Sequence, residues 1–181
     1  MVTAMLGRAL VVVAALAASA RADDSMPFGI EATVGVYDGM GAGIRMGDGR
    51  FAVHVIGAWQ PLLVTSESDD PLAGPELDLY STFQANVDLC VLLSEPTVRS
   101  TFGLTAGYKG SNYLGHGGGL GFYATIDARE RVSYFIIGGV TWFPRGEDRL
   151  REKESIPMDQ ELTFPGPAWN AGLNLGISFS P

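Results

Sequence analysis

The chain has 181 residues and carries 12 basic against 20 acidic side chains, which gives a formal net charge of −8 at pH 7. This acidic balance leaves no basic stripe to neutralise phosphates, so it argues against nucleic acid as a partner. Cys90 is the single cysteine, which excludes an internal disulfide and predicts a small residue inside a strand. The carboxylates are scattered without ligand spacing, so we predict neither a metal site nor a cofactor.

Residues 1–22 have the features of a secretory signal peptide. Arg8 gives a charged start, residues 9–18 are an unbroken run of Ala, Val and Leu, and Ala22 ends an A-x-A cleavage site. The apolar run is too short to cross a bilayer as a helix. We predict cleavage after Ala22, which removes two of the 12 basic residues and leaves 10 against 20 acidic ones. Residues 23–181 then form one domain.

This domain reads as a series of eight β-strands, because apolar and polar residues alternate with a period of two. The last strand, residues 169–179, shows the pattern most clearly, with the sequence W-N-A-G-L-N-L-G-I-S-F. Its odd-numbered residues are Trp, Ala, Leu, Leu, Ile and Phe, and its even-numbered residues are Asn, Gly and Ser. In chain order, the predicted strands span residues 28–37, 41–47, 51–60, 76–93, 98–108, 119–127, 131–143 and 169–179.

The connections between these strands differ in length. Short turns are predicted near Asp38, Asp48, Glu95 and Ala128, whereas residues 61–75, 109–118 and 144–167 form longer loops. The segment 144–167 is the longest and contains a run of charges, so we predict a mobile loop outside the sheet. Membrane barrels have short periplasmic turns and longer outer loops, and these lengths fit that arrangement.

Alternation alone does not fix which face of the sheet points outward, because a soluble barrel with an apolar interior alternates too. The polar faces here are mostly Gly, Asn, Thr, Ser and Tyr, which is too little charge for a wall in water. Aromatic residues lie near the ends of the apolar faces, as in the girdles of a lipid-facing wall: Phe28, Phe51, Trp59, Tyr108, Trp142, Trp169 and Phe179. We therefore predict an all-β fold, an eight-stranded antiparallel up-and-down transmembrane β-barrel over residues 23–181. The alternative is a soluble exported β-barrel that binds a small apolar ligand.

In this pattern, residues 28–179 resemble the small eight-stranded outer-membrane barrels of the OmpA/OmpX type. The resemblance rests on strand number and alternation and on no specific motif. It implies a place in the outer membrane of a Gram-negative cell envelope, contact with lipid and lipopolysaccharide, and assembly by the barrel-assembly machinery. It also implies a monomer with a structural or adhesive role through its outer loops.

A barrel of eight strands is just wide enough to be filled by side chains, so we predict a packed lumen in place of a pore. Glu31 and Arg45 lie on the polar faces of neighbouring predicted strands, and an unpaired buried charge is costly. We therefore expect these two residues to pair within a larger network. The predicted polar network of the lumen consists of Glu31, Arg45, His54, Gln84, Asn86 and Asp88.

We predict no enzymatic activity. The two histidines are His54, in H-V-I, and His116, in H-G-G, and neither matches the local His-x-Ser pattern of outer-membrane barrel deacylases. His116 and Ser66, Ser68 or Asp69 fall in or beside predicted outer loops, but their spacing gives no support for a catalytic constellation.

Overall fold

The computed structural model describes residues 28–47, 50–67, 74–94, 100–129, 131–158, 161–163 and 169–180. The predicted signal peptide and its cleavage site lie outside these residues. Within these ranges the strands are β1 (Phe28–Gly35), β2 (Met40–Met46), β3 (Phe51–Glu67), β4 (Glu76–Leu92), β5 (Ser100–Ser111), β6 (Gly115–Arg129), β7 (Val132–Trp142), β8 (Glu161–Thr163) and β9 (Trp169–Phe179). The helix α2 spans Gly146–Glu154.

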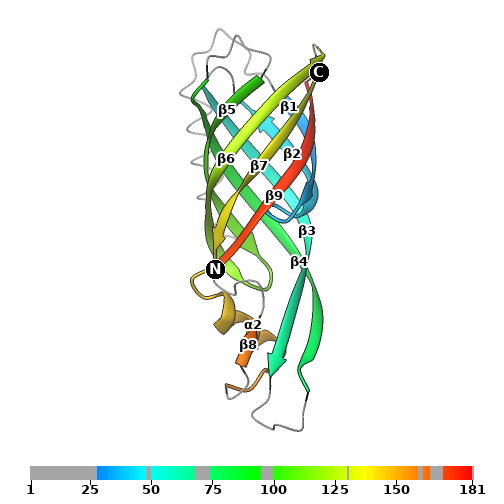
Figure 1. Cartoon of the computed structure of the whole chain (residues 1–181), viewed down its shortest axis with the longest axis vertical. Helices are drawn as coiled ribbons and strands as arrows, with labels where there is room; N and C mark the ends of the chain where they lie inside the picture. Colours follow the sequence, from blue (N-terminus) through cyan, green and yellow to red (C-terminus); the bar gives the residue numbers. More distant parts are fainter. Residues whose placement is uncertain are drawn as a thin grey trace.

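Eight of these strands close into an antiparallel ring. Each strand from β1 to β6 pairs with the next one, β7 pairs with β9, and β9 pairs back onto β1. The remaining strand, β8, adds only to the end of β3. Figure 1 shows the ring as a tall barrel of tilted strands. The predicted all-β, eight-stranded antiparallel barrel is confirmed.

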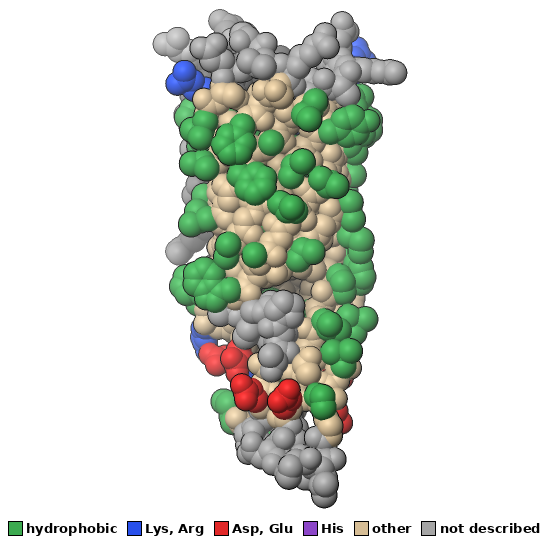
Figure 2. Space-filling view, viewed as in Figure 1, with side chains coloured by type: hydrophobic (Ala, Val, Ile, Leu, Met, Phe, Trp, Pro, Cys, Tyr) green, Lys and Arg blue, Asp and Glu red, His purple; other side chains and the backbone are tan. Residues whose placement is uncertain are grey.

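The alternation of the sequence places polar side chains inside the ring and apolar side chains outside it. Glu31 and Asp88 are buried in the interior, whereas Leu120 is 70% exposed and Leu173 is 55% exposed on the outer wall. Figure 2 shows hydrophobic side chains over most of the height of this wall. Among the described residues, no helix is long and apolar enough to cross a membrane.

The hairpin of β3 and β4 continues well beyond the barrel. Residues 61–67, predicted to be part of a loop, instead extend β3, and residues 61–66 pair with the beginning of β4. The ladder between β2 and β3 ends at Trp59, so Pro61 lies where β3 has lost one of its neighbours. An edge of this kind tolerates a residue without a backbone N–H, which is why Pro61 does not end the strand.

The predicted long loop at residues 144–167 is also wrong in part, because it contains α2 and β8. Leu150 of α2 is fully buried against Val64 of β3 and Leu162 of β8, which gives this region a small core of its own. Acidic residues in the first turn of α2 and basic residues in the last turn complement the helix dipole. We call α2, β8 and residues 61–67 and 76–81 the cap, and it lies at the lower end in Figure 1.

The predicted girdle residues fall at two levels of the barrel. Phe28, Phe51 and Phe179 lie where β1 and β3 begin and β9 ends, which is the end away from the cap. Trp142 and Trp169 are direct partners across β7 and β9 near the cap, and their rings stack with centroids 5.8 Å apart. All seven predicted girdle side chains are exposed or half-buried: Phe28, Phe51, Trp59, Tyr108, Trp142, Trp169 and Phe179.

Candidate functional site

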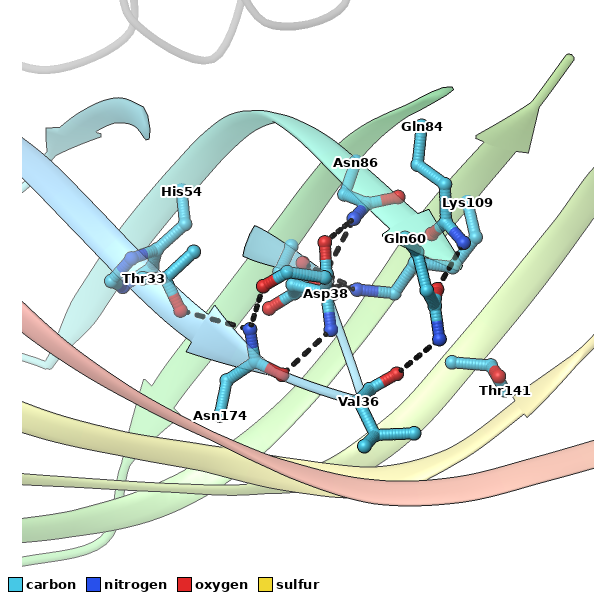
Figure 3. A network of polar contacts seen from close by, with 12 residues as sticks. Thr33, Val36, Asp38, His54, Gln60, Gln84, Asn86, Lys109, Thr141 and Asn174 are labelled. Carbon is cyan, nitrogen blue, oxygen red and sulfur yellow. Dashed lines mark hydrogen bonds and ion pairs between the residues drawn. The ribbon is translucent and has the colours of Figure 1, made fainter. Parts of the chain in front are cut away.

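The connection between β1 and β2 lies inside the barrel and closes its lumen. β1 ends at Gly35 and β2 begins at Met40, while the neighbouring strands β3 and β9 continue toward the cap. Tyr37 and Asp38 of this turn are 2% and 0% exposed. Because the turn contacts side chains from β4, β5 and β9, it fills the centre of the ring (Figure 3).

Glycines on the inner face of the wall make room for the turn. A Cβ at Gly119 of β6 would lie 2.6 Å from the Tyr37 hydroxyl oxygen, and a Cβ at Gly172 of β9 would lie 2.9 Å from the Tyr37 backbone nitrogen. Gly39, in the turn itself, has a φ of +82°, a conformation that side chains disfavour. These glycines are therefore explained by the close approach of the turn to the wall.

Amide side chains from the wall hold the turn by its backbone. The Asn174 Oδ1 atom accepts a hydrogen bond from the Asp38 backbone N–H at 3.0 Å, and its Nδ2 atom donates to the Gly39 carbonyl at 2.8 Å. From the other side, Asn86 Nδ2 donates to the Asp38 carbonyl at 3.2 Å. Gln60 Nε2 donates to the Val36 carbonyl at 2.9 Å. Side chains of the barrel wall thus bond the Asp38 N–H and the carbonyls of Val36, Asp38 and Gly39, which keeps these buried backbone groups paired.

Lys109 provides the buried cation of the lumen. Its Nζ atom donates to Asp38 Oδ1 and, at 2.7 Å, to Asp88 Oδ2, and all three side chains are fully buried. The same nitrogen lies 4.1 Å from the centroid of the Tyr37 ring. One cation therefore joins the turn, β4 and β5. Lys109 was not among the predicted network residues, because the predicted strand ends at residue 108 and leaves Lys109 in a loop.

A second buried pair of polar side chains, Glu31 and His54, lies nearer the end away from the cap. The predicted partner of Glu31 was Arg45. Glu31 Oε2 lies 2.7 Å from His54 Nδ1, and no ion pair joins Glu31 to Arg45 among the described residues. The residue directly opposite Glu31 on β2 is Gly43, which has no side chain, so Glu31 can reach across β2 to His54 on β3. Arg45 is only half-buried, and its Nε atom has no hydrogen-bond partner among the described residues.

Aromatic rings fill the lumen beside this pair. The His54 ring lies 4.8 Å from the Tyr123 ring and 5.9 Å from the Phe135 ring, measured between centroids. Tyr123 and Phe135 belong to a buried cluster that also includes Cys90, opposite Ala52 in the ladder. The lumen thus contains an ionic layer around Lys109 and an aromatic layer around His54.

The other predicted network residues also face inward. Gln84 Nε2 donates to Gln60 Oε1, and Asn86 and Asp88 contact the turn and its cation. His116, in contrast, lies on the outer wall, where its Nδ1 atom is bonded to the Tyr108 hydroxyl. Ser66 is buried in the extended part of β3, and Ser68 and Asp69 lie outside the described residues. Within the described part of the chain, no group of three His, Cys, Asp or Glu residues is placed to hold a metal ion.

Comparisons with known proteins give a likeness of fold. No protein-family model matches the chain, and no curated protein sequence matches it. A major outer membrane protein from Thermus thermophilus is similar in structure, with a TM-score of 0.57 and 14% identity over 86% of this chain and 99% of that one. CarO and CarO2 from Acinetobacter baumannii give TM-scores of 0.42, with 12% and 11% identity over 86% and 87% of this chain and 98% and 100% of theirs. The chain has the fold of an outer-membrane β-barrel.

Proposed function

We propose that this protein is an outer-membrane barrel with a closed lumen, which anchors the cap at the cell surface for a structural or adhesive role. The observation that carries the proposal is the turn between β1 and β2, whose residues Tyr37, Asp38 and Gly39 are buried in the lumen. Because Asn86, Lys109 and Asn174 hold the turn from three strands, the barrel has the construction of an anchor and not of a channel.

The distribution of polarity supports the membrane part of this proposal. A soluble barrel that binds a small apolar ligand needs an apolar cavity and a polar outer wall. Here the interior holds Glu31, Asp88 and Lys109, while Leu120 on the wall is 70% exposed. Figure 2 shows hydrophobic side chains over most of the height of this wall. Exposed apolar surface of this extent in a monomer indicates an apolar environment around the wall.

The cap supports the display part of the proposal. Its small core of Val64, Leu150 and Leu162 gives it a defined shape beyond the barrel. Arg151 fixes α2 further, since its Nη2 atom lies 2.8 Å from Glu147 Oε1 and its Nη1 atom donates to the Pro157 carbonyl at 2.7 Å. A structured element of this kind offers a partner a surface that needs no ordering on binding.

The closed lumen predicts that the purified protein gives no steady ion conductance in planar lipid bilayers. We expect the buried turn and its polar contacts to block the path of hydrated ions through the ring. A conducting porin in the same bilayers serves as the positive control. Stable single-channel currents carried by the natural chain would show that the turn leaves the lumen, and would contradict the proposed anchor.

Surface display predicts that the cap is accessible from outside intact cells and the opposite end is not. Cys90 is fully buried, so a new cysteine gives the only expected site for a membrane-impermeant maleimide. Asp78→Cys, exposed in the cap, should react on intact cells, whereas Arg50→Cys, exposed at the other end, should react only after lysis. The reverse pattern would place the cap in the periplasm.

A further inference from the structure

A pocket of about 330 Å³ lies between the helix of the cap and the turn that joins β5 to β6. Ser111 at the end of β5 lines the pocket together with Asn112 and Tyr113 of the turn, and α2 supplies Arg149, Glu152 and Lys153. The lining is therefore polar, and it contains two cationic side chains against one carboxylate. This excess of positive charge stands out in a chain whose net charge is −8.

Unlike Arg151 of α2 and Arg145 just before the helix, the two cations of the pocket form no ion pair with the described residues. Arg151 is bound to Glu147, and Arg145 lies 3.9 Å from Asp148. The Arg149 guanidinium makes no ion pair or hydrogen bond with any of the described residues, and it is exposed. An exposed arginine at a pocket, whose guanidinium has no partner among the described residues, can bind an anion in bidentate fashion.

Lys153 is held in place over the same turn. Its Nζ atom donates to the Asn112 carbonyl at 3.3 Å and lies 3.6 Å from the centroid of the Tyr113 ring. An ammonium group has three donors, so this arrangement positions the cation and leaves donors for a ligand. Arg149 and Lys153 are four residues apart on α2, which places both on one face of the helix.

The pocket lies beside the lipid-facing wall at the level where the barrel meets the cap. Arg149 Nε lies 3.5 Å from the position that a Cβ on Gly115 would occupy. The next residue, His116, is exposed on the outer wall and bonded to Tyr108 of the predicted girdle. Aromatic girdles mark the depth of lipid headgroups, so the pocket opens at headgroup level.

We infer that this pocket binds a phosphate group on the sugar headgroup of an outer-leaflet glycolipid. Arg149 and Lys153 contact the phosphate, and the Glu152 carboxylate accepts hydrogen bonds from sugar hydroxyls next to it. The inference rests on the proposed membrane location, because the wall is what brings a headgroup to this level. A headgroup of this class also explains why a carboxylate lies beside two cations, since a bare phosphate gains nothing from Glu152.

The test compares lipids that differ only in phosphate. The natural chain in nanodiscs is titrated with phosphorylated lipid A and with the same lipid after enzymatic dephosphorylation, and bound lipid is counted by native mass spectrometry. We expect the phosphorylated lipid to bind about tenfold more tightly, which is the size of effect that charge-assisted contacts give. The Arg149→Gln/Lys153→Gln variant should lose this preference.

A matched variant, Arg145→Gln/Arg50→Gln, removes the same charge from exposed positions outside the pocket and should keep the preference. Equal binding of both lipids by the natural chain, or loss of preference in both variants, would overturn the inference. Displacement of the lipid by an equal concentration of inorganic phosphate would show a site for soluble phosphate instead. Failure of the membrane proposal gives a different result, since the protein would then stay folded and monomeric in buffer without detergent.

Discussion

Replacing Lys109 by methionine is expected to lower the free energy of unfolding by about 3–5 kcal/mol, the usual cost of removing one partner from a buried ion pair. Lys109 is the cation shared by the Asp38 and Asp88 carboxylates, and the three side chains are fully buried. Without it, two like charges remain close together in the buried interior of the ring. Asp38 belongs to the turn, so the same substitution also weakens the closure of the barrel. Denaturant titration in lipid vesicles measures the change.

A triple variant separates the loss of charge balance from the loss of packing. Lys109→Met combined with Asp38→Asn and Asp88→Asn removes the cation and both carboxylates together, so most of the stability should return. Asp88→Asn alone should cost less than Lys109→Met, because Lys109 keeps Asp38 as its partner. If Lys109→Met is as stable as the natural chain, the ion cluster does not hold the turn in the lumen.

The barrel itself was predictable because each of its strands has one face toward the interior and one face toward the outside. The bounds of β9, Trp169–Phe179, match the predicted residues 169–179, and β7 differs from its prediction by one residue at each end. In such strands a shift of one residue would turn every side chain to the wrong face, so the sequence pattern is strongly constrained. Local alternation is therefore enough to find them.

The cap was not predictable in the same way, because its elements depend on distant residues. The buried residues of α2 are Gly146 and Leu150. Leu150 packs against Val64 of β3 and Leu162 of β8. A helix with one apolar anchor shows no periodic stripe, and its charges read as those of a solvated loop. Pro61 gave a further misleading signal, since it stands inside a strand and not at its end.

The sequence predicted several of the residues that line the lumen, but it did not predict which of them pair with one another. Alternation assigns Glu31, His54 and Asp88 to the interior, yet the partner of Glu31 depends on Gly43 leaving a path across β2. Lys109 continues the inward-facing positions of β5 by one step, so a longer predicted strand would have included it. The sequence does not predict that Asp38 lies in the lumen, because a turn signal does not reveal whether the turn is inside the ring.

Leu173→Arg is expected to destabilise the barrel by roughly 2–4 kcal/mol, because it places a charge on the lipid-facing wall near the middle of β9. Leu173 is 55% exposed on that wall and pairs with Gly138 of β7. The unfolding free energy in vesicles gives the value. Leu173→Phe is the control, since it keeps an apolar group in lipid and should cost little.

The neighbouring substitution, Asn174→Leu, is expected to be damaging for a different reason. Asn174 bonds Asp38, Gly39 and Thr33 at once. Each buried polar group left without a partner costs about 1–3 kcal/mol. Stability measurements at positions 173 and 174 therefore do not distinguish a lipid-facing wall from a packed interior, and a direct probe of the surroundings is needed.

Fluorophores on single cysteines supply that probe. Leu173→Cys faces the wall, and Asn170→Cys, on the same strand, faces the mouth of the lumen, where a half-buried side chain leaves space that position 174 lacks. In vesicles of brominated lipid, the label at 173 should be quenched and the label at 170 should be shielded by the ring. Quenching at 170 alone would invert the two faces of the barrel. Quenching at neither position would mean that the apolar wall does not face lipid, and the proposed membrane location would fail with it.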